Sequence, residues 1–557
     1  MDHNQPSQPE TGLKYRLGAF LLTSLILTSC ASPTLWGTYS TPTPNAVSTP
    51  VGTDTKTPFL QPSPTVPLVI HPTGTHTHQN DFFTPTGTPQ LFSTTNSPSV
   101  TSTPFENILK PTNTPTSGTP GSSTLYYTQS GDTLPVVATH FGVDVSDIGF
   151  SSPLPEKGLI DPGTPLVIPN RLSDISPSER ILPDSEFVFS ATAIGFDTTS
   201  FINEKDGHLS IYKEYLGSVG WKTGPELIDK VSLENSVNPR LFLALLDYKS
   251  HWVRGSPTNF AENVYPFGYQ NERYKNLYLQ STWAVQELSI GYYGWRSGTL
   301  TDLTFPDGTR IRIAPDLNAG SVAIQYFFSR SLNPPEWAQA IDPRVGFPAL
   351  YTEMFGDPWV RAKDIEPLFP EGLKQPALVL PFEPNREWSF SQGPHSAWEH
   401  EGPQAALDFA PSTDSSGCVT SEKWVVASAP GLVVRSGNGV VMLDLDGDNY
   451  EQTGWNLLYL HIATKDRTKL GTWLEMDGHI GFPSCEGGVS TGTHLHFARK
   501  YNGEWIMADG PLPFILSGWT VHAGSKPYEG TLTKGDRTIT ANPFGTAEAI
   551  IFREQDE

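Results

Sequence analysis

The chain has 557 residues, which is too many for one hydrophobic core, so we expect several domains. It is acidic, with 36 Lys and Arg against 58 Asp and Glu and a formal net charge of -22. The sequence contains no basic stripe, which argues against nucleic acid as a partner.

The N-terminus has the pattern of an export signal. Lys14 and Arg16 precede the apolar run LGAFLLTSLIL, which is too short for a membrane span and is typical of a signal peptide over residues 1–30. The run ends at Leu-Thr-Ser-Cys30, which resembles the bacterial lipobox. This resemblance implies that Cys30 becomes lipidated and anchors an extracytoplasmic protein to the membrane at the cell surface or cell wall. The alternative is a cleaved signal that carries no lipid.

Residues 31–122 are rich in Ser, Thr and Pro, as in PTNTPTSGTP. Such a segment cannot bury enough apolar surface to offset the entropy cost of ordering it. We predict a disordered, extended spacer that carries the later domains away from the membrane.

Residues 123–170 predict a small βααβ module. An aromatic strand leads into Gly131, Asp132 and Thr133, a turn that begins a helix, and PGTPLVIP closes the segment as a strand. This pattern resembles the lysin motif (LysM), although Ser152-Pro153 stands where that family usually has Asn-Pro. The resemblance implies binding of N-acetylglucosamine chains, with Gly131, Asp132 and Thr133 among the motif residues. A structural module without ligand is the alternative.

Residues 175–375 are mainly helical by pattern, with Pro239 near one helix start. The stretch PRLFLALLDYKS resembles the segment around the catalytic glutamate of lysozyme-like transglycosylases. Lys249 occupies the position of that glutamate, and a lysine cannot protonate a glycosidic oxygen. Asp247 and Glu234 lie nearby in sequence but not where the resemblance requires an acid. We therefore expect a non-catalytic domain that holds glycan or serves as a platform.

Residues 377–521 consist of short alternating runs between Gly and Pro, which predict an antiparallel β domain. Its metal-binding candidates lie in GPHSAWEHEGPQAALDFAP, LLYLHIA and THLHF. Zinc hydrolases commonly use three His, Asp or Glu ligands and leave one position to water. Spacing alone does not choose among these candidates: His395, His400, Asp408, His461, His494 and His496.

Together the three stretches resemble the lysostaphin-type zinc metallopeptidases, and most of all their β-lytic branch. The usual His-x-x-x-Asp pair is absent, since Gln404 stands four residues before Asp408. The resemblance implies one catalytic Zn²⁺ held by His395, Asp408 and His496, with His400 as the rival ligand. It also implies that His461 and His494 are the unligated catalytic histidines. Tyr459, at i−2 from His461, is expected to support the oxyanion or substrate.

Two further patterns occur in this domain. Cys418 and Cys485 form an isolated pair in an exported protein, which predicts a disulfide; a two-cysteine metal site is the alternative. Asp444, Asp446 and Asp448 alternate as in calcium loops, but the distal Glu of an EF-hand is missing, so a solvated turn is favoured. We expect residues 522–557 to be a small β appendage without a chemical role.

Taken together, these resemblances imply a cell-surface zinc endopeptidase that hydrolyses peptide cross-links or stems of peptidoglycan. LysM binding of the glycan would raise the local concentration of peptide. The alternative is a catalytically silent wall-binding or amidase-activator protein.

Overall fold

The computed structural model describes residues 122–217, 219–398, 401–412 and 417–555. The predicted signal peptide with Cys30, nearly all of the spacer, and His400 lie outside the described residues. Among the helices that are described, none is long and apolar enough to cross a membrane.

The first described unit is a three-stranded antiparallel sheet in the order β1–β3–β2, packed against one helix. Thr133 caps that helix by accepting a hydrogen bond from Val136 N, as the turn predicts. The second predicted helix is wrong, because the chain forms a single 3-10 turn there. The elements are β1 (Ser123–Tyr127), α1 (Leu134–Phe141), η2 (Val145–Asp147), β2 (Gly149–Phe150) and β3 (Pro165–Pro169).

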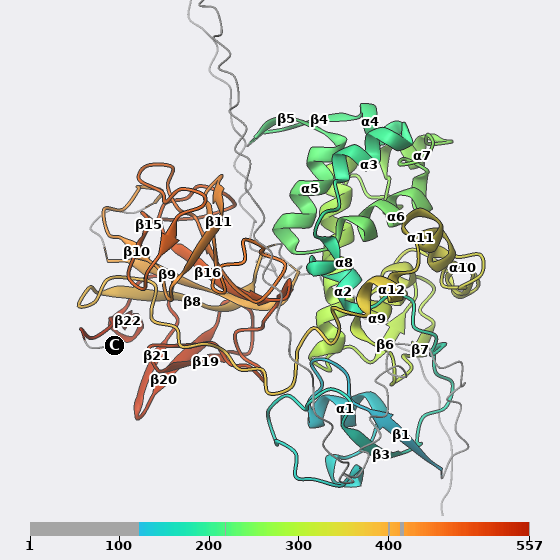
Figure 1. Cartoon of the computed structure of the whole chain (residues 1–557), viewed down its shortest axis with the longest axis horizontal. Coiled ribbons are helices and arrows are strands. Elements are labelled where there is room, and N and C mark those ends of the chain that lie inside the picture. The colour runs from blue at the N-terminus through green and yellow to red at the C-terminus, as the bar shows by residue number, and fades with distance from the viewer. Residues whose placement is uncertain (1–121, 218, 399–400, 413–416, 556–557) are drawn as a thin grey trace, which may run out of the picture. The chain divides into compact units, whose positions relative to one another are not determined.

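The region from 175 to 375 is mainly helical, as predicted (Figure 1). Asn238 caps α6 and Pro239 is its first residue, and almost every apolar side chain of α6 is buried. Two two-stranded sheets accompany the helices. The elements are α2 (Asp184–Phe187), η3 (Ala191–Ala193), α3 (Thr198–Lys205), α4 (His208–Ile211), β4 (Lys213–Leu216), β5 (Gly220–Thr223), α5 (Gly224–Asn235), α6 (Pro239–Ser250), α7 (Phe260–Val264), α8 (Asn276–Arg296), β6 (Asp302–Thr304), β7 (Arg310–Arg312), α9 (Ala319–Ser329), α10 (Pro334–Ala340), α11 (Phe347–Phe355) and α12 (Pro358–Ala362).

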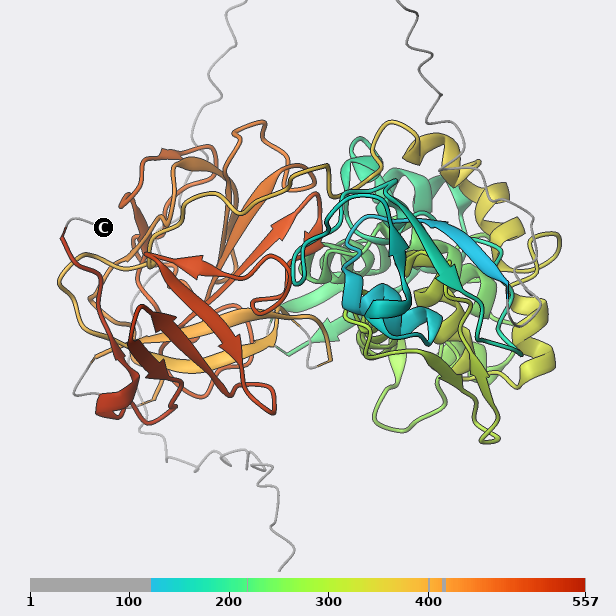
Figure 2. The same ribbon diagram turned by 90° about the horizontal axis from the view of Figure 1, so that it is seen from below.

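The C-terminal part is built on a 9-stranded antiparallel sheet in the order β14–β11–β12–β13–β16–β9–β8–β22, with β17 paired to β16. A four-stranded sheet, β18–β19–β20–β21, lies beside β8, as Figure 2 shows. The elements are β8 (Trp388–Ser396), β9 (Gln404–Pro411), β10 (Val425–Val426), β11 (Gly431–Gly437), β12 (Val440–Asp444), β13 (Trp455–Leu460), β14 (Trp473–Leu474), β15 (His479–Gly481), β16 (Leu495–Tyr501), β17 (Glu504–Trp505), β18 (Ile515–Leu516), β19 (Trp519–Ala523), β20 (Gly530–Lys534), β21 (Arg537–Thr540), η4 (Ala547–Ala549) and β22 (Ile550–Ile551).

The two faces of this sheet belong to different hydrophobic cores. Leu407, Tyr459 and Phe497 point into a core shared with the C-terminal strands. Their neighbours Ala406 and Ala498 point to the other face, into a core that is continuous with the helical region. Because side chains alternate along a strand, the helical region covers the face from which Asp408 and His496 also project.

Buried polar contacts accompany the apolar contact between the helical region and the sheet. Arg296 on α8 donates two hydrogen bonds to Glu504, each 3.0 Å long, and a third to Asp184 at 2.9 Å. Tyr292 OH also donates to Glu504, at 2.7 Å. All of these side chains are buried, so the contact behaves as protein interior rather than as a loose domain interface.

The predicted boundary at residue 521 is wrong, because it falls inside β19. Residues 522–557 complete the four-stranded sheet and add β22 to the edge of the 9-stranded sheet. Leu532, Ile539 and Ile551 are buried in the same core as the strands before residue 521. The expected appendage is therefore an integral part of the C-terminal domain.

Candidate metallopeptidase site

Three adjacent strands bring together His395, Asp408 and His496. His496 on β16 lies directly opposite Asp408 on β9, so both side chains project from one face of the sheet. On the other side of β9, the pairing with β8 shifts register between Gln392 and His395. That irregularity brings the His395 side chain to the same point as the other two.

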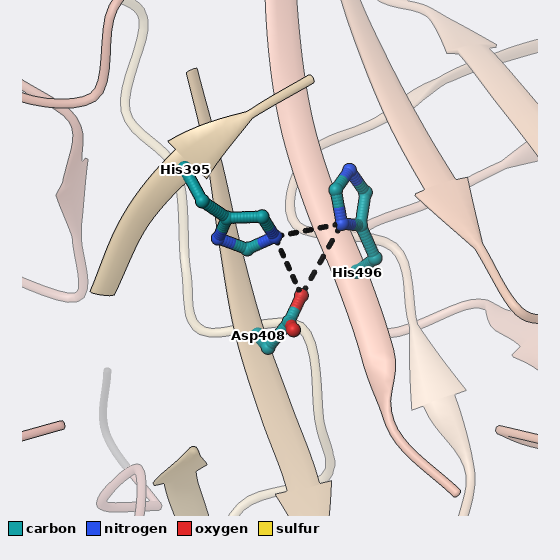
Figure 3. A group of neighbouring side chains, drawn as sticks. All are labelled: His395, Asp408 and His496. Atoms are coloured by element: carbon teal, nitrogen blue, oxygen red, sulfur yellow. Dashed lines mark hydrogen bonds and ion pairs between the residues drawn. The ribbon is translucent and has the colours of Figure 1, made fainter. Parts of the chain in front are cut away.

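The three side chains converge through one atom each (Figure 3). His395 Nε2 lies 3.1 Å from His496 Nδ1 and 3.3 Å from Asp408 Oδ1. His496 Nδ1 also lies 3.3 Å from Asp408 Oδ1. All three residues are buried, and Asp408 Oδ1 forms no hydrogen bond within the described part of the chain.

Backbone carbonyls fix the tautomers of both imidazoles. His395 Nδ1 donates to Gly393 O at 2.8 Å, and His496 Nε2 donates to Ala397 O at 2.9 Å. The nitrogen of each ring that faces Asp408 therefore presents a lone pair. Two lone pairs and a carboxylate oxygen face one another in a buried space, an arrangement that a cation stabilises.

The spacing of these atoms fits a zinc ion. Ligand atoms about 2.0–2.1 Å from a tetrahedral metal lie about 3.3 Å from one another, close to the three distances observed. Two neutral imidazoles and one carboxylate are a usual catalytic zinc set that leaves a fourth position open.

The electrostatics of the metal-free chain favour the charge states that a metal requires. Burial opposes the charge on Asp408, but His395 and His494 outweigh burial and hold the pKa of this carboxyl well below its usual range. Burial lowers the pKa of His496. Burial also lowers the pKa of His395, but Asp408 outweighs that effect and the net pKa is raised, so a proton competes with the metal at this ring.

His461 and His494 lie beside this cluster. Their ring centroids are 4.5 Å apart, and His494 Nε2 lies 3.3 Å from Asp408 Oδ2. His461 Nδ1 donates to Glu486 O at 2.9 Å, and His494 Nδ1 donates to Gly492 O at 2.8 Å. Burial and the neighbouring histidines lower the pKa of His461 to about 3, so this ring is neutral. The Nε2 of His461 therefore presents a lone pair that can accept a hydrogen bond.

The expectation for Tyr459 is wrong. Its side chain is fully buried in the core on the opposite face of the sheet, where its hydroxyl accepts a hydrogen bond from Ser428 N at 2.8 Å. The prediction extended strand alternation through residue 461. The strand ends at Leu460, however, and His461 adopts a left-handed conformation with φ 67°, which turns its side chain to the metal-binding face.

Tyr528, which sequence reasoning missed, lies against the cluster. Its ring stacks on His395 with centroids 4.7 Å apart. Gly393 N donates to Tyr528 O at 2.8 Å, and Tyr528 N donates to Pro394 O at 3.0 Å. A Cβ on Gly393 would collide with the backbone of Glu529, which explains the glycine of the Gly-Pro-His motif.

Cys418 and Cys485 form the predicted disulfide. The loop that contains Cys418 also contacts the residue before His494, since Thr493 N donates to Gly417 O at 3.1 Å. The cross-link therefore supports the segment that leads into His494.

Two other positions from the sequence analysis, the glycan-motif residues and Lys249, make contacts within the protein. Asp132 and Thr133 are buried, and a Cβ on Gly131 would collide with Arg296, so these residues shape the start of α1. Lys249 is held near Ser331, with Nζ 3.4 Å from Oγ, and burial lowers its pKa to about 8.

The acids near Lys249 in sequence are already paired. Asp247 accepts hydrogen bonds from Arg254 and two backbone N–H groups, and Glu234 pairs with Lys230. Neither carboxyl is placed as the free general acid that a glycosidase needs.

Parts of the chain are similar to known proteins. Residues 180–368 match the family model described as "LasA, N-terminal domain". Protease LasA of Pseudomonas aeruginosa is 23% identical over 359 residues, which cover 62% of this chain and 79% of that protein. These matches make the chain similar to LasA-like M23 peptidases.

The Beta-lytic metalloendopeptidase of Achromobacter lyticus is 26% identical over 167 residues, which cover 29% of this chain and 41% of that protein. Among solved structures, the M23 metalloprotease pseudoalterin aligns with 21% identity and a TM-score of 0.25, over 30% of this chain and 96% of that one.

Proposed function

We propose that the chain is a zinc endopeptidase that hydrolyses peptide bonds of peptidoglycan outside the cytoplasm. The convergence of His395 Nε2, Asp408 Oδ1 and His496 Nδ1 on one buried point carries this proposal. Its relatives Protease LasA and Beta-lytic metalloendopeptidase support the reaction class.

His395, Asp408 and His496 would hold the ion. When bound, zinc supplies a Lewis acid and lowers the pKa of a bound water toward neutrality. His494 accepts the proton of the attacking water at Nε2, since its Nδ1 proton is committed to Gly492 O. His461 Nε2 orients the same water, because this neutral ring can only accept there.

Tyr528 is placed to stabilise the charge that develops on the scissile carbonyl. Its ring stacks on His395, and two backbone hydrogen bonds hold the Tyr528 backbone beside Gly393 and Pro394. Burial and the nearby Asp408 raise the pKa of its hydroxyl, so the group stays protonated and able to donate.

The segments before the peptidase domain would localise it. In this proposal, Cys30 carries a lipid that holds the chain at the membrane, residues 31–122 act as a spacer, and residues 123–170 bind glycan as LysM modules do. The helical region would not cleave glycan, because Lys249 stands in place of the acid. Detergent phase partitioning tests the anchor. Wild type should enter the detergent phase, and a Cys30→Ala variant should stay in the aqueous phase.

The peptidase is tested by incubating residues 31–557 with peptidoglycan and counting new amino termini. A fragment beginning at residue 377 would expose the apolar sheet face that the helical region covers, so the longer chain is the suitable one. Cleavage should stop with a zinc chelator and return with zinc. His496→Ala should be inactive, and His522→Ala, an exposed histidine in the same domain, should be active.

This experiment also distinguishes the silent wall-binding or activator protein. That alternative predicts adherence to peptidoglycan with no new amino termini under any metal condition. It also predicts no difference in adherence between His496→Ala and wild type.

A further inference from the structure

The loop between β12 and β13 concentrates negative charge without a matching cation. One carboxylate oxygen from each of Asp444, Asp446 and Asp448 lies within 4.8 Å of the others. No described lysine, arginine or histidine forms an ion pair with any of the three. The nearby Arg435 and Lys500 form ion pairs with Glu451 rather than with these aspartates.

A second observation at the same place comes from Asn456. Its side chain is fully buried, and its Oδ1 has no hydrogen-bond partner within the described part of the chain. Its Nδ2 donates to Thr453 O at 2.7 Å, which fixes the orientation of the amide. A flip would turn Oδ1 toward that carbonyl, so Oδ1 remains a buried, unpaired acceptor, a state that proteins rarely leave uncompensated.

The register of the sheet places Asn456 beside one of these aspartates. Asn456 on β13 lies directly opposite Asp444 on β12, and cross-strand partners share a face. Thr453, which accepts from Asn456, donates its hydroxyl to Asp448 at 2.6 Å. The amide is therefore held between the buried Asp444 and the loop.

The exposed Asp446 carboxylate lies close to Gly454. A Cβ on Gly454 would collide with Asp446 Oδ2, so only glycine permits this approach. Backbone N–H groups of Asp446, Asp448 and Asn449 bond carboxylate oxygens of the first two aspartates. Those bonds fix the carboxylates and leave their second lone pairs available.

We propose that Asp444, Asp446, Asp448 and Asn456 form a calcium-binding site. Carboxylate and amide oxygens are the ligands that Ca²⁺ prefers, and it tolerates the irregular geometry of a loop. Zn²⁺ prefers imidazole and thiolate, so this site is chemically distinct from the cluster at His496. The ion would supply the missing positive charge and give Asn456 Oδ1 a partner.

The position of the site indicates a structural effect. Asp444 ends β12 and Asn456 lies near the start of β13, at the opposite end of that strand from Leu460 and His461. We therefore expect calcium to raise thermal stability through binding to the folded chain and to leave the zinc cluster unchanged.

The test uses residues 31–557, stripped of calcium and loaded with one equivalent of zinc. Calorimetric titration with CaCl₂ should give one calcium per chain, and the unfolding temperature should rise with calcium. Asp446→Asn and Asp448→Asn should each weaken binding at least about ten-fold, because calcium affinity depends on ligand charge. Asn456→Ala should also weaken binding. Asp466→Asn, an exposed aspartate in another loop, should bind as wild type does.

Three results would overturn the proposal. The first is no saturable calcium binding up to about 5 mM, the weak end of protein calcium sites. The second is binding that Asp446→Asn and Asp448→Asn leave unchanged, which would indicate counterion adsorption elsewhere. The third is equal affinity for Mg²⁺. Because Asp448 is exposed, its variant should keep the native circular dichroism spectrum even where Asn456→Ala does not fold.

Discussion

His140 makes the stability of the chain depend on pH in a way that can be isolated. Its ring stacks on Trp295 with centroids 3.5 Å apart, and Nε2 donates to Trp295 O at 3.1 Å. Burial, together with Arg312, lowers the pKa of His140 from 6.5 to about 3. The folded chain therefore keeps this ring neutral, whereas the unfolded chain protonates it below about pH 6.5.

The sign and size of the effect follow from linkage. The lowered pKa contributes stability that is complete above pH 6.5 and is lost as the pH falls toward 3. Between pH 7.5 and 5, protonation of the unfolded chain should remove about 2 kcal/mol of stability. A His140→Phe variant keeps an aromatic ring against Trp295, cannot titrate, and loses one hydrogen bond worth about 1 kcal/mol.

Urea unfolding, followed by tryptophan fluorescence at both pH values, measures the difference. Wild type should lose about 2 kcal/mol more than His140→Phe does on going from pH 7.5 to 5. Other titrating groups are common to both proteins and cancel. Equal pH dependence in the two proteins would refute the assignment of a buried, neutral His140.

Three further predictions concern other parts of the chain. Arg296→Met should cost about 3–5 kcal/mol in urea unfolding, because Glu504 is left buried without its partner. Tyr528→Phe should lower kcat about 10- to 100-fold with little change in KM, if its hydroxyl donates to the developing oxyanion. Replacing Cys418 and Cys485 by serine should remove up to about 4 kcal/mol, since the cross-link closes a loop over a separation of 67 residues.

Each of these predictions has an outcome that would contradict it. A cost below about 1 kcal/mol for Arg296→Met would mean that the network at Glu504 is solvated. An unchanged kcat in Tyr528→Phe would remove that residue from the reaction. An unchanged unfolding temperature in the double serine variant would show that the loops do not depend on the disulfide.

Local pattern and spacing predict the elements of the site well. The i, i+2 spacing of His494 and His496 indicated a shared location, and both histidines lie beside Asp408 in the structure. The helix start at Pro239 and the cysteine pair follow from local chemistry in the same way. Alternation failed at His461, because a left-handed residue after the strand is not visible in apolar periodicity.

The features of the fold and site that the sequence did not predict depend on contacts between distant segments. Tyr528 reaches the cluster only because the chain returns to pair with Gly393 and Pro394. One sequence signal indicates that the helical region covers the sheet: VVML and LLYL are continuous apolar runs rather than alternating ones. Such runs indicate a strand that is buried on both faces.

Native mass spectrometry of zinc-loaded protein tests the metal assignment most directly. Residues 31–557 should carry one zinc per chain. His461→Ala should retain the zinc and His496→Ala should lose it, because of these two histidines only His496 is a proposed ligand. Stoichiometric zinc in His496→Ala, or none in wild type, would contradict the assignment of His395, Asp408 and His496 as the zinc site.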